Sequence, residues 1–520
     1  MRKLGVLLLL VSAGCASAPI KKADELSLVQ AQTRVLEGCY RCLIEARDVF
    51  ERIAVGKARP LVVARLFETY VLIGLREREL ALDSSQAFGK ARALAAELPP
   101  TYVGLPYVDL AEMIPPDLGG TPRTELSPFM QRAPASARLK ELRSGLTAGE
   151  ASAPFRTYLS ASLDCLANFA NRRDAMSDEV PVPAGTPPLV KYRMGTCPVP
   201  RNAVLEELLT ETPTFVEAGL FIGRRRPQVI TAAWVKQSRE ALANAYDAFP
   251  RSSSVTYAMG AMYQIVGDCT RAVRFYEDTI ALKERHEDAA LQRVVCLGHV
   301  GQFVPAIEGA TRVIDRGYYN LADGYYWRAW NHHRRLELDQ ARADIEKARS
   351  MMVNVQVLTL GGVIKYDQND LVPAERDLNE ALRMDLGQCI AHWYLGLVTF
   401  KKEAWSDGAA RFGASAACYE SSANDAAARL DVMRKSDFEE EFKASQIAGF
   451  EAVIKEDRDQ QWAAILNAAN AFARAGQSET ALKWIDRIPA DAVLASKAAE
   501  LRKLIIGKFG GNFDSRTQLQ

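Results

Sequence analysis

The feature that most restricts the fold of this 520-residue chain is a repeat of about 34 residues in its middle part. One position of the repeat is mostly small: Gly260, Val294, Ala329, Gly362 and Gly396. Twelve residues further on, each unit is small again: Ala272, Ala306, Ala341, Ala374 and Gly408. A mostly bulkier series follows four positions later: Tyr276, Ala310, Ile345, Leu378 and Phe412. A small-to-medium series comes three positions after that: Thr279, Val313, Ala348, Ala381 and Ser415. Such spacing keeps side chains on one helix face, so the repeat predicts two helices per unit.

The small positions allow the two helices of a unit to approach closely, and the bulkier residue fills the space between them. Gly267 and Gly301 fit the turn between the helices in the first two units. We therefore predict an all-α fold, a solenoid of antiparallel helix pairs. Its five regular units tile residues 253–421 without a gap.

This pattern resembles the tetratricopeptide repeat (TPR). The residues that carry the resemblance belong to the first unit, in Met259-Gly260-Ala261-Met262-Tyr263, Ala272 and Tyr276, and to the fifth, in Leu395-Gly396, Gly408 and Phe412. Two features depart from the pattern: Val294 takes the place of a small residue, and the usual closing proline is missing from all five units. A looser unit ending at Pro250 extends the array to 216–421, and another ends at Pro489.

Outside the array, composition and helical periodicity divide the chain further. Proline and glycine clusters interrupt any regular element in one long segment, which we expect to be an irregular excursion. The remaining segments are a helical TPR-like layer, helices with a proline-rich loop, a C-terminal helical region with one further TPR-like unit, and a flexible tail. In order along the chain, these segments are 24–98, 99–154 (the excursion), 155–215, 422–506 and 507–520.

The N-terminus has the pattern of an export signal. Arg2 and Lys3 precede an apolar run, Leu4 to Val11, that is too short to span a bilayer as a stable helix. The next residues, Ser12-Ala13-Gly14-Cys15, resemble the lipobox of bacterial lipoproteins, in which the cysteine is lipidated and becomes the first residue. We expect residues 1–14 to be this signal peptide.

The resemblance implies that Cys15 carries a lipid anchor in a membrane and that residues 15–23 form a tether. Ala16 stands where a retention signal would have aspartate, which implies the outer membrane, facing the periplasm. Cleavage after Ala18 is the alternative. It would place Pro19 just past the cleaved bond, where ordinary signal peptidase tolerates proline badly.

Eight cysteines remain, an even number that suits disulfides in an oxidising compartment. Cys39 and Cys42 have redox-motif spacing, but a structural bridge or buried free thiols are the alternatives that we favour. The geometry of antiparallel helices predicts that Cys389, at the start of a first helix, pairs with Cys418, at the end of the second helix of that unit. The other predicted pairs are Cys269–Cys296 and Cys165–Cys197.

The charge balance and the missing motifs exclude several functions. The chain has 65 Lys and Arg against 64 Asp and Glu, without long runs of one sign, so a nucleic-acid partner is disfavoured. It contains no HExxH, P-loop or GxSxG motif, and we identify no catalytic residue, metal ligand or cofactor. We expect a protein that is not an enzyme; a redox or hydrolytic activity within 99–212 is the alternative.

The TPR resemblance implies a concave groove lined by repeat positions 2, 5, 9 and 12 of the first helices. Exposed aromatic residues there favour extended peptides, apolar side chains or the faces of sugars. The candidate groove-binding residues are Tyr257, Tyr326, Trp330, His333, Tyr366, Trp393 and Phe400. The alternative is that capping elements or the off-register segment 422–456 bury this stripe as core.

These expectations combine into a non-enzymatic, lipid-anchored periplasmic scaffold. Its partner would be a protein or an extended peptide in the groove. A nutrient-binding lipoprotein similar to the SusD family, with aromatic residues that stack on glycans, is the alternative. That family interrupts its repeats with long insertions, whereas five units here run on without interruption.

Overall fold

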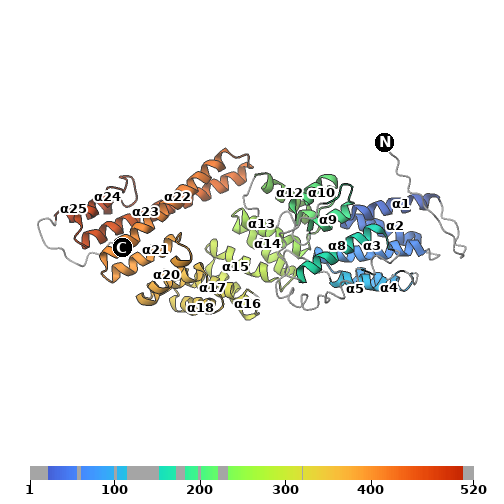
Figure 1. The fold of residues 1–520 in the computed structure, drawn as a ribbon, viewed down its shortest axis with the longest axis horizontal. Helices are drawn as coiled ribbons and strands as arrows, with labels where there is room; N and C mark the ends of the chain where they lie inside the picture. The colour runs from blue at the N-terminus through green and yellow to red at the C-terminus, as the bar shows by residue number, and fades with distance from the viewer. Residues whose placement is uncertain are drawn as a thin grey trace. The chain divides into compact units, whose positions relative to one another are not determined.

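A computed structural model shows two compact units in an all-helical chain (Figure 1). The units are 1–225 with 241–255, and 226–240 with 256–520. The structure describes residues 22–54, 60–98, 102, 104–113, 144, 151–170, 182–196, 201–220, 232–318 and 320–507. Every regular element within these ranges is an α-helix, as predicted. None of the helices found there is long and apolar enough to cross a membrane.

Helix α3 forms the centre of the first unit. It is buried along most of its length, and Phe67 in its middle is wholly inaccessible to solvent, as are Phe50 and Phe155 in the same core. The helices of this unit are α1 (Lys22–Glu37), α2 (Tyr40–Ala54), α3 (Pro60–Glu79), α4 (Ser85–Ala95), α5 (Gly104–Met113), α8 (Ala153–Ala170), α9 (Pro188–Thr196) and α10 (Asn202–Glu211). Helix α5 lies inside the segment 99–154, for which we expected irregular structure. Pro106 is tolerated in its first turn, where the missing N–H has no intrahelical partner to lose.

A buried arginine connects the helices of this unit. Arg76 on α3 is 1% exposed, and its guanidinium lies 4.0 Å from the ring centroid of Tyr192 on α9. It donates hydrogen bonds to Glu79 (2.7 Å) and to the hydroxyl of Tyr158 on α8 (2.9 Å). Because a buried charge needs partners, this arrangement restricts how α3, α8 and α9 can pack together.

The Cys39-to-Cys42 motif forms a disulfide at the start of α2, with its Cα atoms 5.0 Å apart. Both residues are at most 3% exposed. The backbone N–H of Tyr40, between them, donates to the carboxylate of Glu217. Burial raises the pKa of Glu217 to about 7, against the opposing influence of Arg76. Of the alternatives for this motif, the structure shows the buried bridge.

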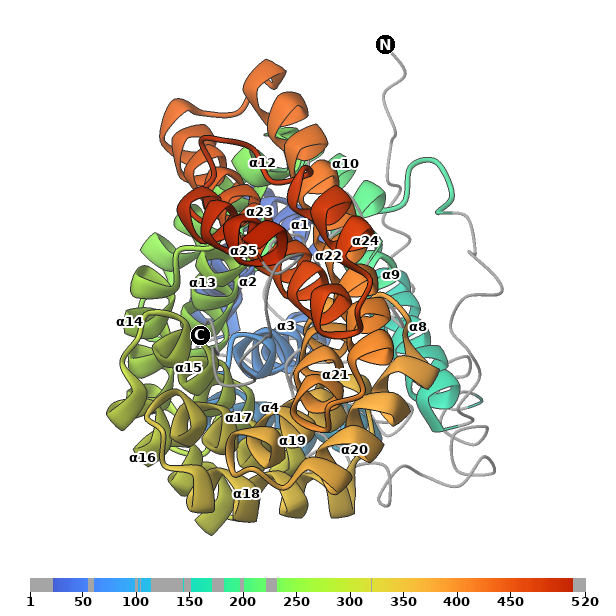
Figure 2. The same cartoon turned by 90° about the vertical axis from the view of Figure 1, so that its left-hand side faces the viewer.

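The second unit contains the five predicted helix pairs apart from residues 253–255. Helix α12 (Ala232–Ala248) precedes the pairs, and its residues from 241 onward belong to the first unit. In Figure 2 the first helices of the pairs follow the inner side of an arc, and the second helices of the first four pairs follow its outer side. The first helices are α13 (Ser253–Ile265), α15 (Glu287–His299), α17 (Leu321–Arg334), α19 (Val355–Asp367) and α21 (Cys389–Lys401). The second helices are α14 (Cys269–Leu282), α16 (Phe303–Asp315), α18 (Leu338–Met351), α20 (Leu371–Met384) and α22 (Trp405–Lys435).

Each pair is held by a contact between one small and one large side chain. A Cβ atom placed on Gly396 would lie 2.6 Å from the Phe412 ring, and one on Gly260 would lie 2.7 Å from the Tyr276 ring. The second pair reverses the order. There Val294 supplies the bulk, in one cluster with Ala310. This exchange accounts for the departure from the TPR pattern at Val294, because the space is filled from the opposite helix.

The turn inside each pair has one residue in the left-handed region, and only some of these residues are glycines. Gly267 and Gly301 have φ angles of 82° and 78°, while Leu336, Asn369 and Glu403 have φ near 62°. In each turn the next backbone N–H returns to a carbonyl five residues earlier, which satisfies the end of the first helix. The sequence revealed only the two glycine turns, because Leu336 and Glu403 are not typical of this conformation. Asn369 adopts it more readily than most residues, but it was not recognised as a turn residue.

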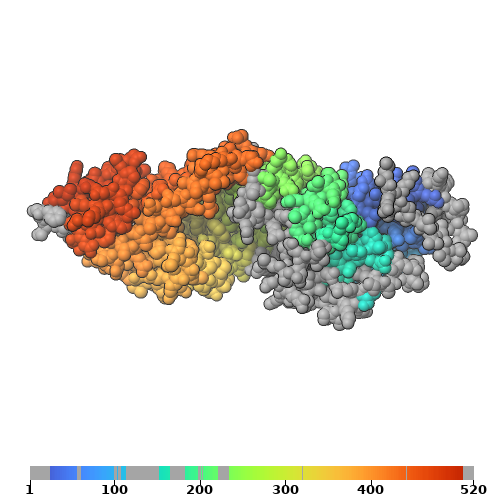
Figure 3. Space-filling model, turned by 45° about the horizontal axis from the view of Figure 1, so that its top comes forward, coloured from blue at the N-terminus to red at the C-terminus, as the bar shows by residue number. Residues whose placement is uncertain are grey.

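The C-terminal region differs from the sequence expectation. Helix α22 does not end at Cys418 or at residue 421 but continues to Lys435, and α23 (Glu440–Arg474) returns along it. Alanines, which favour helix and occupy little space, keep the two long helices in contact. Helices α24 (Ser478–Ile485) and α25 (Ala495–Gly507) follow and form one continuous surface with them (Figure 3, orange to red). Another left-handed glycine, Gly476, lies between α23 and α24.

Helix α23 also contacts the beginning of the array. The side-chain amide of Gln446 donates to the carbonyl of Val266, at the end of α13, over 2.8 Å. Close to the tip of the hairpin, Glu439 pairs with Arg239 on α12. The hairpin of α22 and α23 therefore connects the fifth pair to the region of the first pair, within the second compact unit.

We predict that Gly396→Leu lowers the free energy of unfolding by roughly 1–3 kcal/mol, because the added atoms overpack the contact with Phe412. Urea denaturation followed by circular dichroism measures the change. Gly449→Leu on α23 is the matched control, since no heavy atom lies within 4 Å of its Cβ position. A wild-type denaturation midpoint for Gly396→Leu would contradict the close helix contact.

Candidate functional site

A cavity of about 550 Å³ lies at the inner face of the first two helix pairs, between α13 and α15. Its polar wall contains two amide side chains, and the Nε2 of Gln264 donates to the Oε1 of Gln292 over 2.8 Å. The hydroxyl of Tyr276 donates to the Oε1 of Gln264. The side-chain amides of Gln264 and Gln292 have further donors and acceptors, which can form hydrogen bonds with a peptide group.

Tyr257, one of the candidate groove residues, forms an aromatic wall of this cavity. Its half-buried ring lies 4.7 Å from the ring of His286 and 5.9 Å from that of Tyr276. His286 is fixed in turn, because its Nδ1 accepts the backbone N–H of Ala289 at the start of α15. Burial raises the pKa of Tyr276 above its usual range, so its hydroxyl keeps its proton and donates. Contacts within the protein therefore hold the side chains of this cavity in place without a ligand.

The third pair presents a group of aromatic side chains around Trp330. Its ring lies 5.7 Å from Trp327, 6.1 Å from His299 and 6.2 Å from Phe303. Tyr326 packs edge-on against Trp327 at 5.3 Å. Trp330 and Tyr326 were among the residues predicted from the sequence, whereas Trp327, which occupies a packing position of the repeat, was not. Its three aromatic neighbours show that it belongs to the same group.

His333 and Tyr366 both contact the next pair along the array. The Nε2 of His333 lies 2.7 Å from an Asp367 oxygen. Tyr366 packs edge-on against Tyr394 at 5.2 Å, with the Nζ of Lys401 4.1 Å from its ring centroid. These two predicted residues are half-buried and partnered, so they contribute to the wall between pairs.

The structure places Trp393 and Phe400 against the fifth pair and α23. Trp393 packs on Phe412 at 5.4 Å and against a buried cluster that contains Ala416, Ala464 and Ile465. Phe400 lies 4.8 Å from Trp405, and the Arg474 guanidinium covers it at 5.3 Å. At this end of the array, a C-terminal helix covers part of the aromatic stripe. The residues that cover it, Ala464, Ile465 and Arg474, lie beyond the segment 422–456.

Two predicted disulfides join helices of the array. Cys269 and Cys296 connect α14 to α15 with Cα atoms 4.9 Å apart, and Cys269 borders the cavity. Cys389 and Cys418 connect α21 to α22 with Cα atoms 5.3 Å apart. Cys15, Cys197 and the side chain of Cys165 lie outside the described residues. Within the described ranges, no group of three His, Cys, Asp or Glu side chains could hold a metal ion.

No family model matches this chain, and no curated protein matches it. Similar solved structures include the Cut9–Hcn1 hetero-tetramer, with 11% identity, a TM-score of 0.42, and coverage of 93% of this chain and 97% of that one. YrrB, a TPR protein with an unusual peptide-binding site, has 15% identity, a TM-score of 0.25, and coverage of 50% and 98%. A TPR protein from Parabacteroides merdae has 13% identity, a TM-score of 0.33, and coverage of 58% and 98%.

The helix pairs have the fold of the tetratricopeptide repeat. The TPR array presents three different surfaces along its inner face. They are an amide-lined cavity at the first two repeats, an aromatic group at the third, and a covered apolar surface at the fifth. Of these three surfaces, the cavity and the aromatic group have side chains that can contact a ligand. Gln264 stands at repeat position 12, one of the predicted groove positions, but neither it nor Gln292 was among the candidate site residues, because a lone glutamine in a helix gives no functional signal in a sequence.

We predict that Trp393→Ala lowers the free energy of unfolding by roughly 2–4 kcal/mol, because its ring fills the space between the fifth TPR and α23. Ile390→Ala on the same helix is the control, since this side chain is 48% exposed. Thermal unfolding of the two variants measures the difference. Equal stability of both would mean that Trp393 is not part of the core.

Proposed function

We propose that this protein is a non-enzymatic scaffold that binds an extended segment of a partner protein along the inner face of its TPR array. The observation that carries the proposal is the preformed cavity beside Tyr257, with the hydrogen-bonded amides of Gln264 and Gln292. Amide side chains match the donors and acceptors of a peptide backbone, and an aromatic wall suits a side chain or a proline ring.

The aromatic group at the third TPR supplies the second contact. Trp330 and Trp327 are half-buried and offer apolar surface beside the Arg334 guanidinium, which lies 5.7 Å from the Trp330 ring. An extended partner segment that occupies the cavity with one part can place an apolar side chain here. Stacking on aromatic rings contributes strongly to such interfaces. The partner class is therefore a polypeptide with apolar side chains in an extended stretch.

A SusD-like glycan-binding function is not favoured. The five helix pairs follow one another without an inserted segment. Several of the aromatic residues expected to stack on sugars are instead packed against neighbours, among them Trp393 and Phe400.

We place this scaffold in the bacterial cell envelope, with a lipid on Cys15 holding it to the outer membrane on the periplasmic side. Three disulfides among the described residues support an oxidising compartment, because such bridges are rare in the cytosol. The lipobox resemblance of Ser12-Ala13-Gly14-Cys15 supports the anchor.

Peptides selected from a random display library against the full chain should lose affinity about tenfold or more in Gln292→Ala and in Tyr257→Ala, if these residues form the binding cavity. Fluorescence anisotropy with the best labelled peptide measures the affinity. Arg274→Ala on α14 is the control, because Arg274 is exposed and does not line the cavity. Unchanged binding in both cavity variants would refute the proposed site.

Cys15→Ala should move the protein from the membrane fraction to the soluble fraction of cells, because the variant lacks the thiol that receives the lipid. Labelled fatty acid should appear in the wild type and be absent from the variant. Cys39→Ala, at a buried cysteine, is the control and should keep the label. Label that persists in Cys15→Ala would exclude the lipoprotein assignment.

A further inference from the structure

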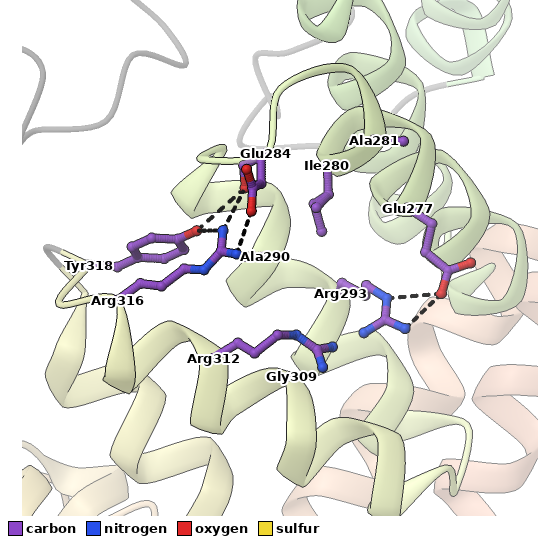
Figure 4. Close-up of a pocket in the computed structure, with 10 residues that line it drawn as sticks. All are labelled: Glu277, Ile280, Ala281, Glu284, Ala290, Arg293, Gly309, Arg312, Arg316 and Tyr318. Carbon is purple, nitrogen blue, oxygen red and sulfur yellow. Dashed lines mark hydrogen bonds and ion pairs between the residues drawn. The ribbon is translucent and has the colours of Figure 1, made fainter.

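A second cavity, of about 410 Å³, lies on the outer side of the array between α14, α15 and α16 (Figure 4). Three arginines line it: Arg293 from α15, Arg312 from α16, and Arg316, which caps the C-terminus of α16. The apolar part of the cavity lining consists of Ile280, Ala281 and Ala290. It is separate from the proposed peptide site, which lies between the inner helices α13 and α15.

Two of these arginines have acidic partners. Arg293 donates through Nε and Nη2 to a single oxygen of Glu277, at 2.9 and 2.7 Å. Arg316 donates to Glu284 at 2.6 Å. Arg312 forms no ion pair within the described part of the chain, and Figure 4 shows its guanidinium pointing toward that of Arg293 with no carboxylate between them. Three cations and two carboxylates leave the cavity lining with a net charge of +1.

The next TPR shows what such an arginine binds when its own unit supplies the partner. Arg328 occupies the repeat position of Arg293, and Asp344 holds it with two hydrogen bonds of 2.7 Å. The repeat position of Asp344 is Gly309 in the second TPR. The second TPR therefore lacks the carboxylate that the third TPR directs at its arginine.

Because residue 309 is a glycine, α16 directs no carboxylate at Arg293 from this position. A Cβ atom placed on Gly309 would lie 2.9 Å from the Cγ2 of Val294 and 3.5 Å from the Nη1 of Arg293, the nitrogen that Glu277 does not use. Arg312 follows Gly309 by three residues on α16, so both lie on the same face of this helix. Two guanidinium groups that point at each other repel unless an anion lies between them.

We propose that this outer cavity is a binding site for an organic carboxylate carrying a short apolar group. The carboxylate would lie between the Nη1 of Arg293, which Glu277 leaves unused, and the guanidinium of Arg312. The apolar group would lie against Ile280, Ala281 and Ala290. Both a small carboxylic acid and the C-terminus of a polypeptide have this chemistry. The proposal does not depend on peptide binding at the inner face.

Isothermal titration of the full chain with N-acetyl-leucine at low salt tests the site. We expect saturable binding that weakens with added sodium chloride, because the contact is ionic. Arg312→Gln should weaken binding about tenfold, since it removes one of two charge-assisted partners. Arg274→Gln, which removes one exposed positive charge outside the cavity, should leave it unchanged. Equal effects of these two variants, or no saturable binding by the wild type, would overturn the proposal.

Glu277→Gln provides a test in the opposite direction. It removes a competing carboxylate from Arg293, so N-acetyl-leucine should bind more tightly, which a purely structural ion pair does not predict. Inorganic phosphate is a further probe, and tighter binding of phosphate than of the carboxylate would overturn the assigned ligand class. A pentapeptide ending in leucine, compared with its C-terminal amide, separates the two sources. Tighter binding of the free-acid peptide than of N-acetyl-leucine indicates a polypeptide terminus, and equal binding indicates a small acid.

Discussion

The contact between a small and a large residue inside each helix pair is the constraint on which the array depends. Two helices can pack only where their facing side chains together fill the space, and it does not matter which helix supplies the bulk. Four pairs place the larger residue on the second helix, and the pair with Val294 and Ala310 places it on the first. The repeat of about 34 residues is visible in the sequence because this contact recurs in every unit.

Structure that depends on this recurring contact could be predicted from the sequence. Helix pairs, their order and two disulfides of the array follow from local periodicity, and they agree with the structure. The length of α22 could not be predicted, because an alanine-rich stretch suits both the end of a TPR and a longer helix. The turns at Leu336 and Glu403 were missed because tertiary packing imposes a backbone conformation that these residues disfavour.

Repeat geometry predicts which side chains face the groove, and that prediction is separate from what each side chain contacts. Tyr257 borders a cavity, and Trp330 lies in a group of aromatic rings. Repeat geometry does not indicate which of the side chains another element covers, and Trp393 lies under α23, a helix distant in sequence. The amides at Gln264 and Gln292 become meaningful only once two helices bring them within 2.8 Å. Likewise, the importance of Gly309 emerges only from comparison with Asp344 in the following repeat.

The return of α23 to the first helix pair changes the mechanics of the array. The curvature of an open solenoid changes easily, because each repeat contacts only its neighbours. Here Gln446 holds the carbonyl of Val266, and Glu439 pairs with Arg239. Opening the arc must break both contacts or bend a hairpin of two long helices. The hairpin therefore limits changes in the curvature of the array, and the length of α23 sets the distance between the first and fifth repeats.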